Sequence, residues 1–177
     1  MVQRFVDGLA KRVFLQHRHG QSSLAHGWQH DLRRHDHVRN VEAQSFEPGL
    51  GEGEGIGLPA GAWLGGLRSV LLMQSSGVGN LVNVLGMVKV CRFPLLMIVT
   101  MRGEAGEFNP WQVPVGQATA RVLETMGVAV RQAGESQTVA AHVHAALRLA
   151  FQAQGAEAVL VAQQVIGIKS FQEQTDQ

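Results

Sequence analysis

The sequence has a single cysteine, Cys91, and almost no net charge, and each scarcity excludes a class of protein. One cysteine excludes an intramolecular disulfide, so we expect a reducing compartment, the cytoplasm. A formal net charge of +1 gives no reason to expect a nucleic acid or an anionic membrane as a partner. Residues 1–16 lack the continuous apolar run and the small-residue cleavage site of a signal peptide.

One segment, Ser69–Val88, carries no charged residue over 20 positions and is long enough to suggest a membrane span. The polar, glycine-containing stretch QSSGVGN interrupts it at its centre, so we interpret it as a strand, a turn and a helix. The whole chain has 177 residues, of which 45% are apolar and 16% charged. This composition is that of a soluble globular domain with a sizeable core.

The chain has two unlike parts. Residues 16–51 are polar and irregular and show no apolar run typical of a buried strand. From residue 52 on, apolar runs alternate with segments that have an apolar face at helical spacing. We predict strands at 69–73, 94–100, 127–132 and 158–165, and helices at 52–67, 80–90, 115–126 and 136–154, the last with Ser136 as its N-cap. This alternation predicts a three-layer α/β domain with a parallel sheet over residues 51–171, after a segment 1–50 and before a tail 172–177.

The N-terminal part is rich in histidine, and the spacing of some of these residues invites a metal-binding interpretation. No helix or strand pattern fixes them, so we interpret them as solvated and assign no metal ligand in this chain. The six histidines concerned are His17, His19, His26, His30, His35 and His37. The three tryptophans, Trp28, Trp63 and Trp111, are expected to be packing residues, with a pocket or a subunit contact left open for Trp111.

Three segments carry candidate chemistry, and each falls at the carboxyl end of a predicted strand or at the start of a predicted helix, where open parallel sheets bind their ligands. GEGEGIGLPAGAWLGG (51–66) places Glu52 and Glu54 at the start of a helix, where acids also simply favour the helix dipole. MQSSGVGN (73–80) joins a buried strand to a helix. It either offers backbone N–H groups to a ligand or is only a tight turn.

A third segment, TMRGEAGEFNPWQVPVGQAT (100–119), contains a loop of some 15 residues. Long loops inside compact domains are usually functional. Arginine is the residue that most often binds a carboxylate or a sulfonate through two parallel hydrogen bonds. Arg102 therefore either binds a substrate anion or pairs structurally with Glu104 or Glu107, and the sequence leaves both alternatives open.

Taken together, three stretches resemble the alpha-subunit group of sulfopyruvate and phosphonopyruvate decarboxylases, which are thiamine-diphosphate enzymes. The stretches are EGEGIGLPAGAWLGGLRSVLLMQSSGVGN, FPLLMIVTMRGEAGEFNPWQVPVGQAT and VLVAQQVIGIKSF, from about Glu52 to Phe171. The resemblance implies the family's pyrimidine-binding fold and the decarboxylation of a 2-oxo acid, sulfopyruvate or phosphonopyruvate. In this family a Glu hydrogen-bonds N1′ of the cofactor's aminopyrimidine ring and so promotes loss of the thiazolium proton. Glu52 matches that position, with Glu54 as the alternate.

The resemblance also implies the remaining contacts. The turn that contacts the pyrimidine and the reacting carbon matches Gln74, Ser75, Ser76, Gly77, Val78, Gly79 and Asn80, and the substrate candidates are Arg102 and Gln112. In this family a separate domain with a Gly-Asp-Gly motif holds the diphosphate and its Mg²⁺, and this sequence contains no such motif. The implied assembly is therefore a hetero-oligomer in which a beta subunit clamps the cofactor against this chain.

The sequence departs from the family before the predicted helix. Relatives have Thr-Thr-Glu-Glu-Glu-Gly where this chain has Leu50-Gly51-Glu52-Gly53-Glu54-Gly55, and they have a strand that residues 1–50 do not show. We therefore expect a divergent or poorly ordered N-terminal part. This expectation keeps an alternative open, namely a non-catalytic binding or structural module that retains the family core. A strand leading into Glu52 favours catalysis, and its absence favours the module.

Overall fold

A computed structural model describes residues 41–45 and 52–167 of the chain. Within these residues, five strands form one parallel sheet in the order β1-β2-β3-β5-β4. The strands are β1 (Val41–Ser45), β2 (Arg68–Gln74), β3 (Leu95–Thr100), β4 (Ala129–Ala133) and β5 (Ala156–Val161). The predicted α/β class and parallel sheet are confirmed. The proposed borders of the segments at 50 and 171 lie outside the described residues.

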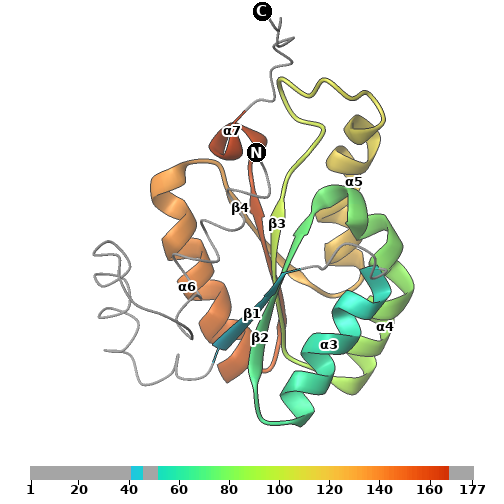
Figure 1. Cartoon of the computed structure of the whole chain (residues 1–177), viewed down its shortest axis with the longest axis vertical. Coiled ribbons are helices and arrows are strands. Elements are labelled where there is room, and N and C mark those ends of the chain that lie inside the picture. The colour runs from blue at the N-terminus through green and yellow to red at the C-terminus, as the bar shows by residue number, and fades with distance from the viewer. Residues whose placement is uncertain (1–40, 46–51, 168–177) are drawn as a thin grey trace, which may run out of the picture.

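The described helices lie in layers on the two faces of this sheet. They are α3 (Glu52–Leu64), the 3-10 helix η1 (Ser75–Leu81), α4 (Val82–Cys91), α5 (Gln112–Thr125), α6 (Ser136–Gln152) and the short α7 (Gln163–Ile166). Figure 1 shows α3, α4 and α5 on one side of the sheet and α6 on the other. The predicted three-layer arrangement is therefore present.

The two faces of the sheet carry two separate hydrophobic clusters, because side chains alternate between the faces along each strand. On one face, strand residues pack with helix residues from α3, η1, α4 and α5, including Leu71, Met97, Ile56, Val78, Leu85 and Leu123. On the other face, strand residues pack with α6, including Val70, Ile98, Val143, Ala146 and Leu147. All six residues of β3 are buried, which explains why its sequence is an uninterrupted apolar run.

The uncharged segment Ser69–Val88 forms most of β2, all of η1 and the start of α4, as the interpretation of it as strand, turn and helix predicted. Among the described residues, no helix is both long enough and apolar enough to cross a membrane.

The sequence left open whether a strand precedes Glu52, and the structure has one. Val41–Ser45 forms β1, which pairs in parallel with β2 from Arg68 to Leu72. Among the described strands, β1 lies at the edge of the sheet and has a neighbour on one side. Its sequence, VEAQS, therefore lacks the apolar run by which the strands inside the sheet can be recognised.

Three local predictions are also wrong. The predicted strand 158–165 ends at Val161, and the residues from Gln163 to Ile166 form α7. Ser136 is the first residue of α6 and not its cap; the N-cap is Glu135, whose backbone oxygen accepts the hydroxyl of Thr138 at 2.9 Å. The predicted loop of some 15 residues is shorter, since α5 already begins at residue 112.

Candidate active site

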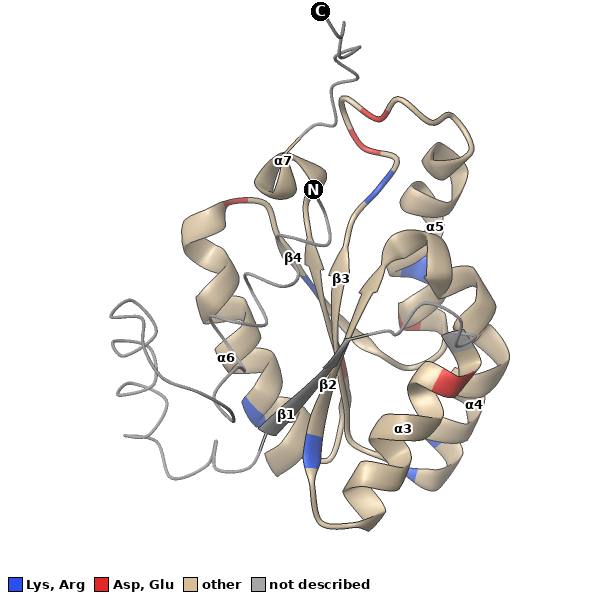
Figure 2. Cartoon of the chain, in the orientation of Figure 1, with Lys and Arg blue, Asp and Glu red and all other residues tan. Residues whose placement is uncertain are grey.

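The candidate segments gather at the carboxyl ends of three adjacent strands. η1 follows β2, residues 101–111 (the 101–111 loop) follow β3, and α7 begins one residue after β5. Figure 2 shows the charged residues of the 101–111 loop together beyond this end of the sheet. Open parallel sheets bind ligands at this edge, so the structure brings together the segments that the sequence singled out separately.

The turn after β2 is a 3-10 helix in which the predicted cofactor residues differ in their surroundings. The hydroxyl of Ser75 is buried and accepts the backbone N–H of Arg102 at 2.9 Å. The Val78 side chain belongs to the hydrophobic core, so this residue has only its backbone to offer a ligand. Of the others, Gly77 is buried, Gln74 and Ser76 are half-buried, and Gly79 and Asn80 are exposed.

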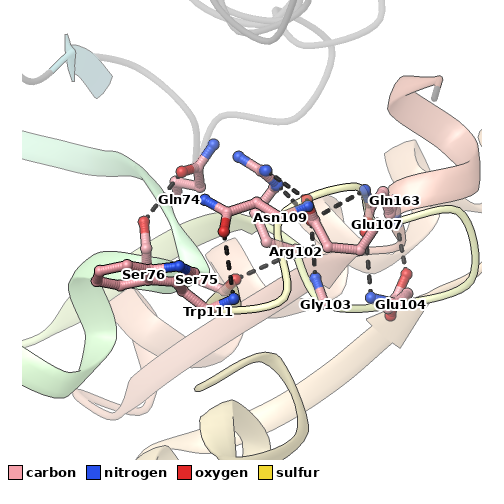
Figure 3. Close-up of polar contacts among 10 residues, drawn as sticks. All are labelled: Gln74, Ser75, Ser76, Arg102, Gly103, Glu104, Glu107, Asn109, Trp111 and Gln163. Carbon is pink, nitrogen blue, oxygen red and sulfur yellow. Dashed lines mark hydrogen bonds and ion pairs between the residues drawn. The ribbon is translucent and has the colours of Figure 1, made fainter. Parts of the chain in front are cut away.

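The half-buried pair of this turn is held in place by one hydrogen bond. The hydroxyl of Ser76 donates to Oε1 of Gln74 at 2.9 Å (Figure 3). At Gly79 an added Cβ would meet no atom within 4 Å, so space is open on that side of the turn. The turn thus presents an amide, a hydroxyl and an open glycine side by side.

α3 brings the predicted acids toward the same region. Glu52 is its first residue, and the direction of its side chain lies outside what the structure describes. Gly53 faces α4, where an added Cβ would lie 3.3 Å from Cγ2 of Val84. Ile56 is buried in the same cluster as Val78 of η1. The first turns of α3 therefore pack beside η1 and α4, and Glu54 on this helix is exposed.

Glu107 is the centre of the 101–111 loop. Its Oε2 accepts Nε–H of Arg102 at 2.6 Å, the backbone N–H of Gly103 at 3.1 Å and Nε2–H of Gln163 at 3.2 Å. Its Oε1 accepts Nη2–H of Arg102 at 2.6 Å and the backbone N–H of Asn109 at 3.0 Å. Figure 3 shows these donors converging on one carboxylate. The loop is therefore folded around a single buried negative charge.

This arrangement perturbs both members of the ion pair. The side chain of Glu107 is 1% exposed and that of Arg102 is 9% exposed. The hydrogen bond from Arg102 holds the pKa of Glu107 far below its usual range, with the N–H groups of Asn109 and Gly103 acting in the same direction against the effect of burial. The hydrogen bond to Glu107 in turn raises the pKa of Arg102. Both side chains are therefore charged at neutral pH.

The sequence left open whether Arg102 pairs with Glu104 or with Glu107, and the structure shows Glu107. A bidentate carboxylate contact fixes the plane of a guanidinium group. The guanidinium also lies over the ring of Phe108, with its central carbon 5.5 Å from the ring centroid. Because the backbone N–H of Arg102 donates to Ser75, the same residue joins the 101–111 loop to η1.

Gln163 was missed by sequence reasoning and belongs to this cluster. It is 4% exposed and follows β5 at the start of α7. Its backbone N–H donates to Oε2 of Glu104 at 2.6 Å, and its Oε1 accepts the backbone N–H of Glu104 at 3.1 Å. No local signal marks it, because it lies in the apolar stretch VLVAQQV and its partners are 56 and 59 residues away in the chain.

Two glycines allow the 101–111 loop to lie against the start of α5. Gly103 has a φ of +76°, a left-handed conformation, and an added Cβ would clash with the backbone of residues 112 and 113. At Gly116 an added Cβ would clash with the backbone oxygen of Arg102. Glycine is therefore required at both positions by the close approach of two backbones.

Gln112 and Trp111 lie where this loop joins α5. Gln112 is the first residue of the helix; its Oε1 is buried and, among the described residues, has no hydrogen-bond partner. Trp111 is 84% exposed and does not pack inside the domain, which leaves the alternatives of a pocket or a subunit contact open. Trp63 does pack, since it stacks on Phe151 with ring centroids 6.2 Å apart. Trp28 lies outside the described residues.

The metal-binding question concerns a different part of the chain. All six histidines of the N-terminal part (His17, His19, His26, His30, His35 and His37) lie outside the described residues. Within residues 41–45 and 52–167, no group of three or more His, Cys, Asp or Glu side chains is placed to hold a metal ion.

Comparison with known proteins shows which proteins this chain is similar to in sequence. No protein-family model matches the chain. The chain is 47% identical over 78 residues to sulfopyruvate decarboxylase subunit alpha of Methanococcus maripaludis, a match that covers 44% of this chain and 47% of that protein. It is 44% identical over 81 residues to the same subunit of Methanothermobacter thermautotrophicus, covering 45% of this chain and 49% of that protein.

A second named activity occurs among the relatives. The chain is 39% identical over 75 residues to phosphonopyruvate decarboxylase of Streptomyces viridochromogenes, covering 41% of this chain and 19% of that protein. The matched part of the chain spans about half the length of the curated alpha subunits. These similarities support the sulfopyruvate and phosphonopyruvate decarboxylase family that the sequence motifs indicated.

Proposed function

We propose that this chain, similar to sulfopyruvate decarboxylase alpha subunits over 78 residues, is the pyrimidine-binding half of a thiamine-diphosphate-dependent 2-oxo-acid decarboxylase. It acts with a beta subunit, and its substrate is sulfopyruvate or phosphonopyruvate. The observation that carries the proposal is the gathering of η1, the 101–111 loop and the start of α3 at one end of the sheet. These are the segments in which the family resemblance resides.

Glu52 is the proposed catalytic residue, and Glu54 is the alternate. When bound, the cofactor supplies the electron sink for decarboxylation, and the protein supplies a positioned carboxyl group. β1 supports the catalytic alternative over a non-catalytic module, because a strand now precedes the helix that Glu52 begins. The packing of the first turns of α3 beside η1 gives the same support.

The chemistry of the turn after β2 fits the ring end of the cofactor. Gln74 and Ser76 offer an amide and a hydroxyl, and Gly79 leaves open space for the close approach of a flat ring. Such groups suit a polar aromatic ring better than a divalent cation, which prefers several carboxylate oxygens. We therefore assign the diphosphate and its Mg²⁺ mainly to the beta subunit.

Arg102 and Gln112 are the proposed substrate contacts. Arg102 uses Nε and Nη2 toward Glu107, so the Nη1 edge of its guanidinium points away from that carboxylate. Two N–H groups at that edge match the oxygens of a carboxylate, sulfonate or phosphonate. Gln112 lies where the same loop joins α5, and the Nε2–H groups of its amide are the additional donors proposed for the substrate.

The test is cofactor-dependent CO₂ release from sulfopyruvate and phosphonopyruvate by this chain co-expressed with a subunit that carries the Gly-Asp-Gly motif. Activity is expected only with both chains, thiamine diphosphate and Mg²⁺ present. Glu52→Gln should reduce kcat at least about 100-fold, as expected for loss of a general acid–base group. Glu54→Gln on the same helix is the matched control and should retain activity within about threefold.

Two results would decide against this assignment. Full activity of Glu52→Gln together with inactivity of Glu54→Gln would transfer the role to Glu54. Turnover without thiamine diphosphate, or no turnover of any 2-oxo acid by a correctly assembled complex, would contradict the proposed function itself.

A further inference from the structure

Gln163 directs its backbone N–H and both polar atoms of its side chain at the 101–111 loop. Its backbone N–H and its Oε1 bond to Glu104 at 2.6 and 3.1 Å, and its Nε2 donates to Glu107 at 3.2 Å. Gln163 is buried, so the hydrogen bonds of its side chain are costly to leave unmade. A residue at the end of β5 is thereby joined to a loop that follows β3 (Figure 3).

The contact continues through Glu107 to Arg102. Oε2 of Glu107 receives Gln163 on one side and Nε–H of Arg102 on the other. The guanidinium is held in its own plane by the second bond from Nη2 and by the ring of Phe108. The position of Gln163 therefore bears on the direction in which Arg102 presents its Nη1 edge.

We propose that Gln163 is a positioning residue, which acts through Glu107 to aim Arg102 at the sulfonate or phosphonate group of the substrate. This inference rests on the proposed function. It adds a residue at the junction of β5 and α7 to the contacts predicted after β2 and after β3. A group that binds an unreacting anion contributes similarly to the ground state and to the transition state. Loss of its alignment should therefore appear in KM more than in kcat.

The first experiment measures CO₂ release by the two-subunit complex with Gln163→Met, which keeps the length of the side chain and removes its hydrogen bonds. We expect KM for the 2-oxo acid to rise about 10-fold with kcat within about threefold, the effect of losing roughly one good hydrogen bond. Gln164→Ala is the matched control, because this neighbouring exposed glutamine bonds instead to the backbone oxygen of Gly134 at 2.7 Å. Its KM and kcat should stay within about twofold of wild type.

A double-mutant cycle separates positioning from a general structural role. Arg102→Met alone should raise KM, and Gln163→Met should add little in that background, because residues that act through one another are not additive. Gln163→Glu, which keeps the acceptor for Glu104 but loses the donor to Glu107, is a second single variant and should raise KM in the same direction.

Hydrogen exchange gives a readout that does not depend on activity. The backbone amides of Gly103 and Asn109 bond to Glu107, so they should exchange faster in Gln163→Met than in wild type or in Gln164→Ala. Unchanged exchange, additive effects in the cycle, or a fall in kcat with KM unchanged would each overturn the positioning role while leaving the proposed function standing. A wild-type complex without activity would instead refute the proposed function, and this inference with it.

Discussion

Replacing Glu107 by glutamine tests whether one carboxylate holds the 101–111 loop. Five N–H donors converge on its two oxygens, three on Oε2 and two on Oε1. Glutamine keeps only one of these oxygens and presents an NH₂ group in place of the other, so at least two buried donors lose their acceptor. A buried donor left without an acceptor lowers the free energy of unfolding by about 1–3 kcal/mol, and Arg102 also loses its counter-charge.

We therefore expect Glu107→Gln to lower the free energy of unfolding by about 3 kcal/mol or more at pH 7. For a chain of this size that is a fall in Tm of about 6–12 °C. Urea unfolding of the purified chain, followed by circular dichroism, measures the change. Glu104→Gln is the matched control, since an amide oxygen can still accept the N–H of Gln163 from this exposed position, and its effect should stay below about 1 kcal/mol.

The pH dependence of the stability difference between wild type and Glu107→Gln is a second test of the same role. Because the pKa of Glu107 is lowered on folding, the stabilisation that it provides is fully present above its ordinary pKa of about 4.5 and is lost as the pH falls toward the lowered value. The difference between wild type and Glu107→Gln should thus be constant from pH 5 to 8 and should shrink below about pH 4. A variant as stable as Glu104→Gln at pH 7 would refute the role of Glu107 as the centre of the loop.

Three further outcomes follow from the packing and the charges. Gly116→Ala should lower the free energy of unfolding in urea by several kcal/mol, because its Cβ would clash with the backbone oxygen of Arg102. Gly57→Ala is the control: a Cβ there meets nothing within 4 Å, so this variant should be neutral or more stable by up to about 1 kcal/mol. Burial raises the pKa of Glu157, so the stabilisation that this side chain provides is present below its ordinary pKa and is lost as the pH rises. Glu157→Gln should therefore not lower the free energy of unfolding at pH 7, and a clear loss there would contradict this. Gly79→Ala should leave thermal stability unchanged yet raise KM for thiamine diphosphate in the assembled complex, while unaltered KM would show that the ring does not approach that glycine.

The strands inside the sheet could be predicted from sequence because burial on both faces imposes a visible pattern. β3 and most of β2 are continuous apolar runs, and the apolar faces of α4 and α6 repeat at the spacing of three and four that a helix requires. β1 lacks such a pattern, because it is an edge strand recognised only through its pairing with β2. Gln163 was assigned to a strand because the residues before it are apolar, and its partners in the loop are not local in sequence.

The candidate site could be predicted as a set of segments but not as a set of contacts. Arg102 was identified from its residue type, yet the choice between Glu104 and Glu107 depends on the path of the loop. That path turns at Gly103 and Gly106, both with positive φ, and brings Glu107 back onto Arg102. Likewise, Val78 lies within a correctly identified turn, and only the packing shows that its side chain faces the core.

The order of the strands places the linked junctions of the candidate site on strands inside the sheet. β2, β3 and β5 each have a neighbouring strand on both sides, and the junctions that follow these three are those joined by Ser75, Arg102 and Gln163. β1 lies outermost among the described strands and pairs with β2 alone. Substitutions in β1 that keep this main-chain pairing should therefore leave the three linked junctions in place.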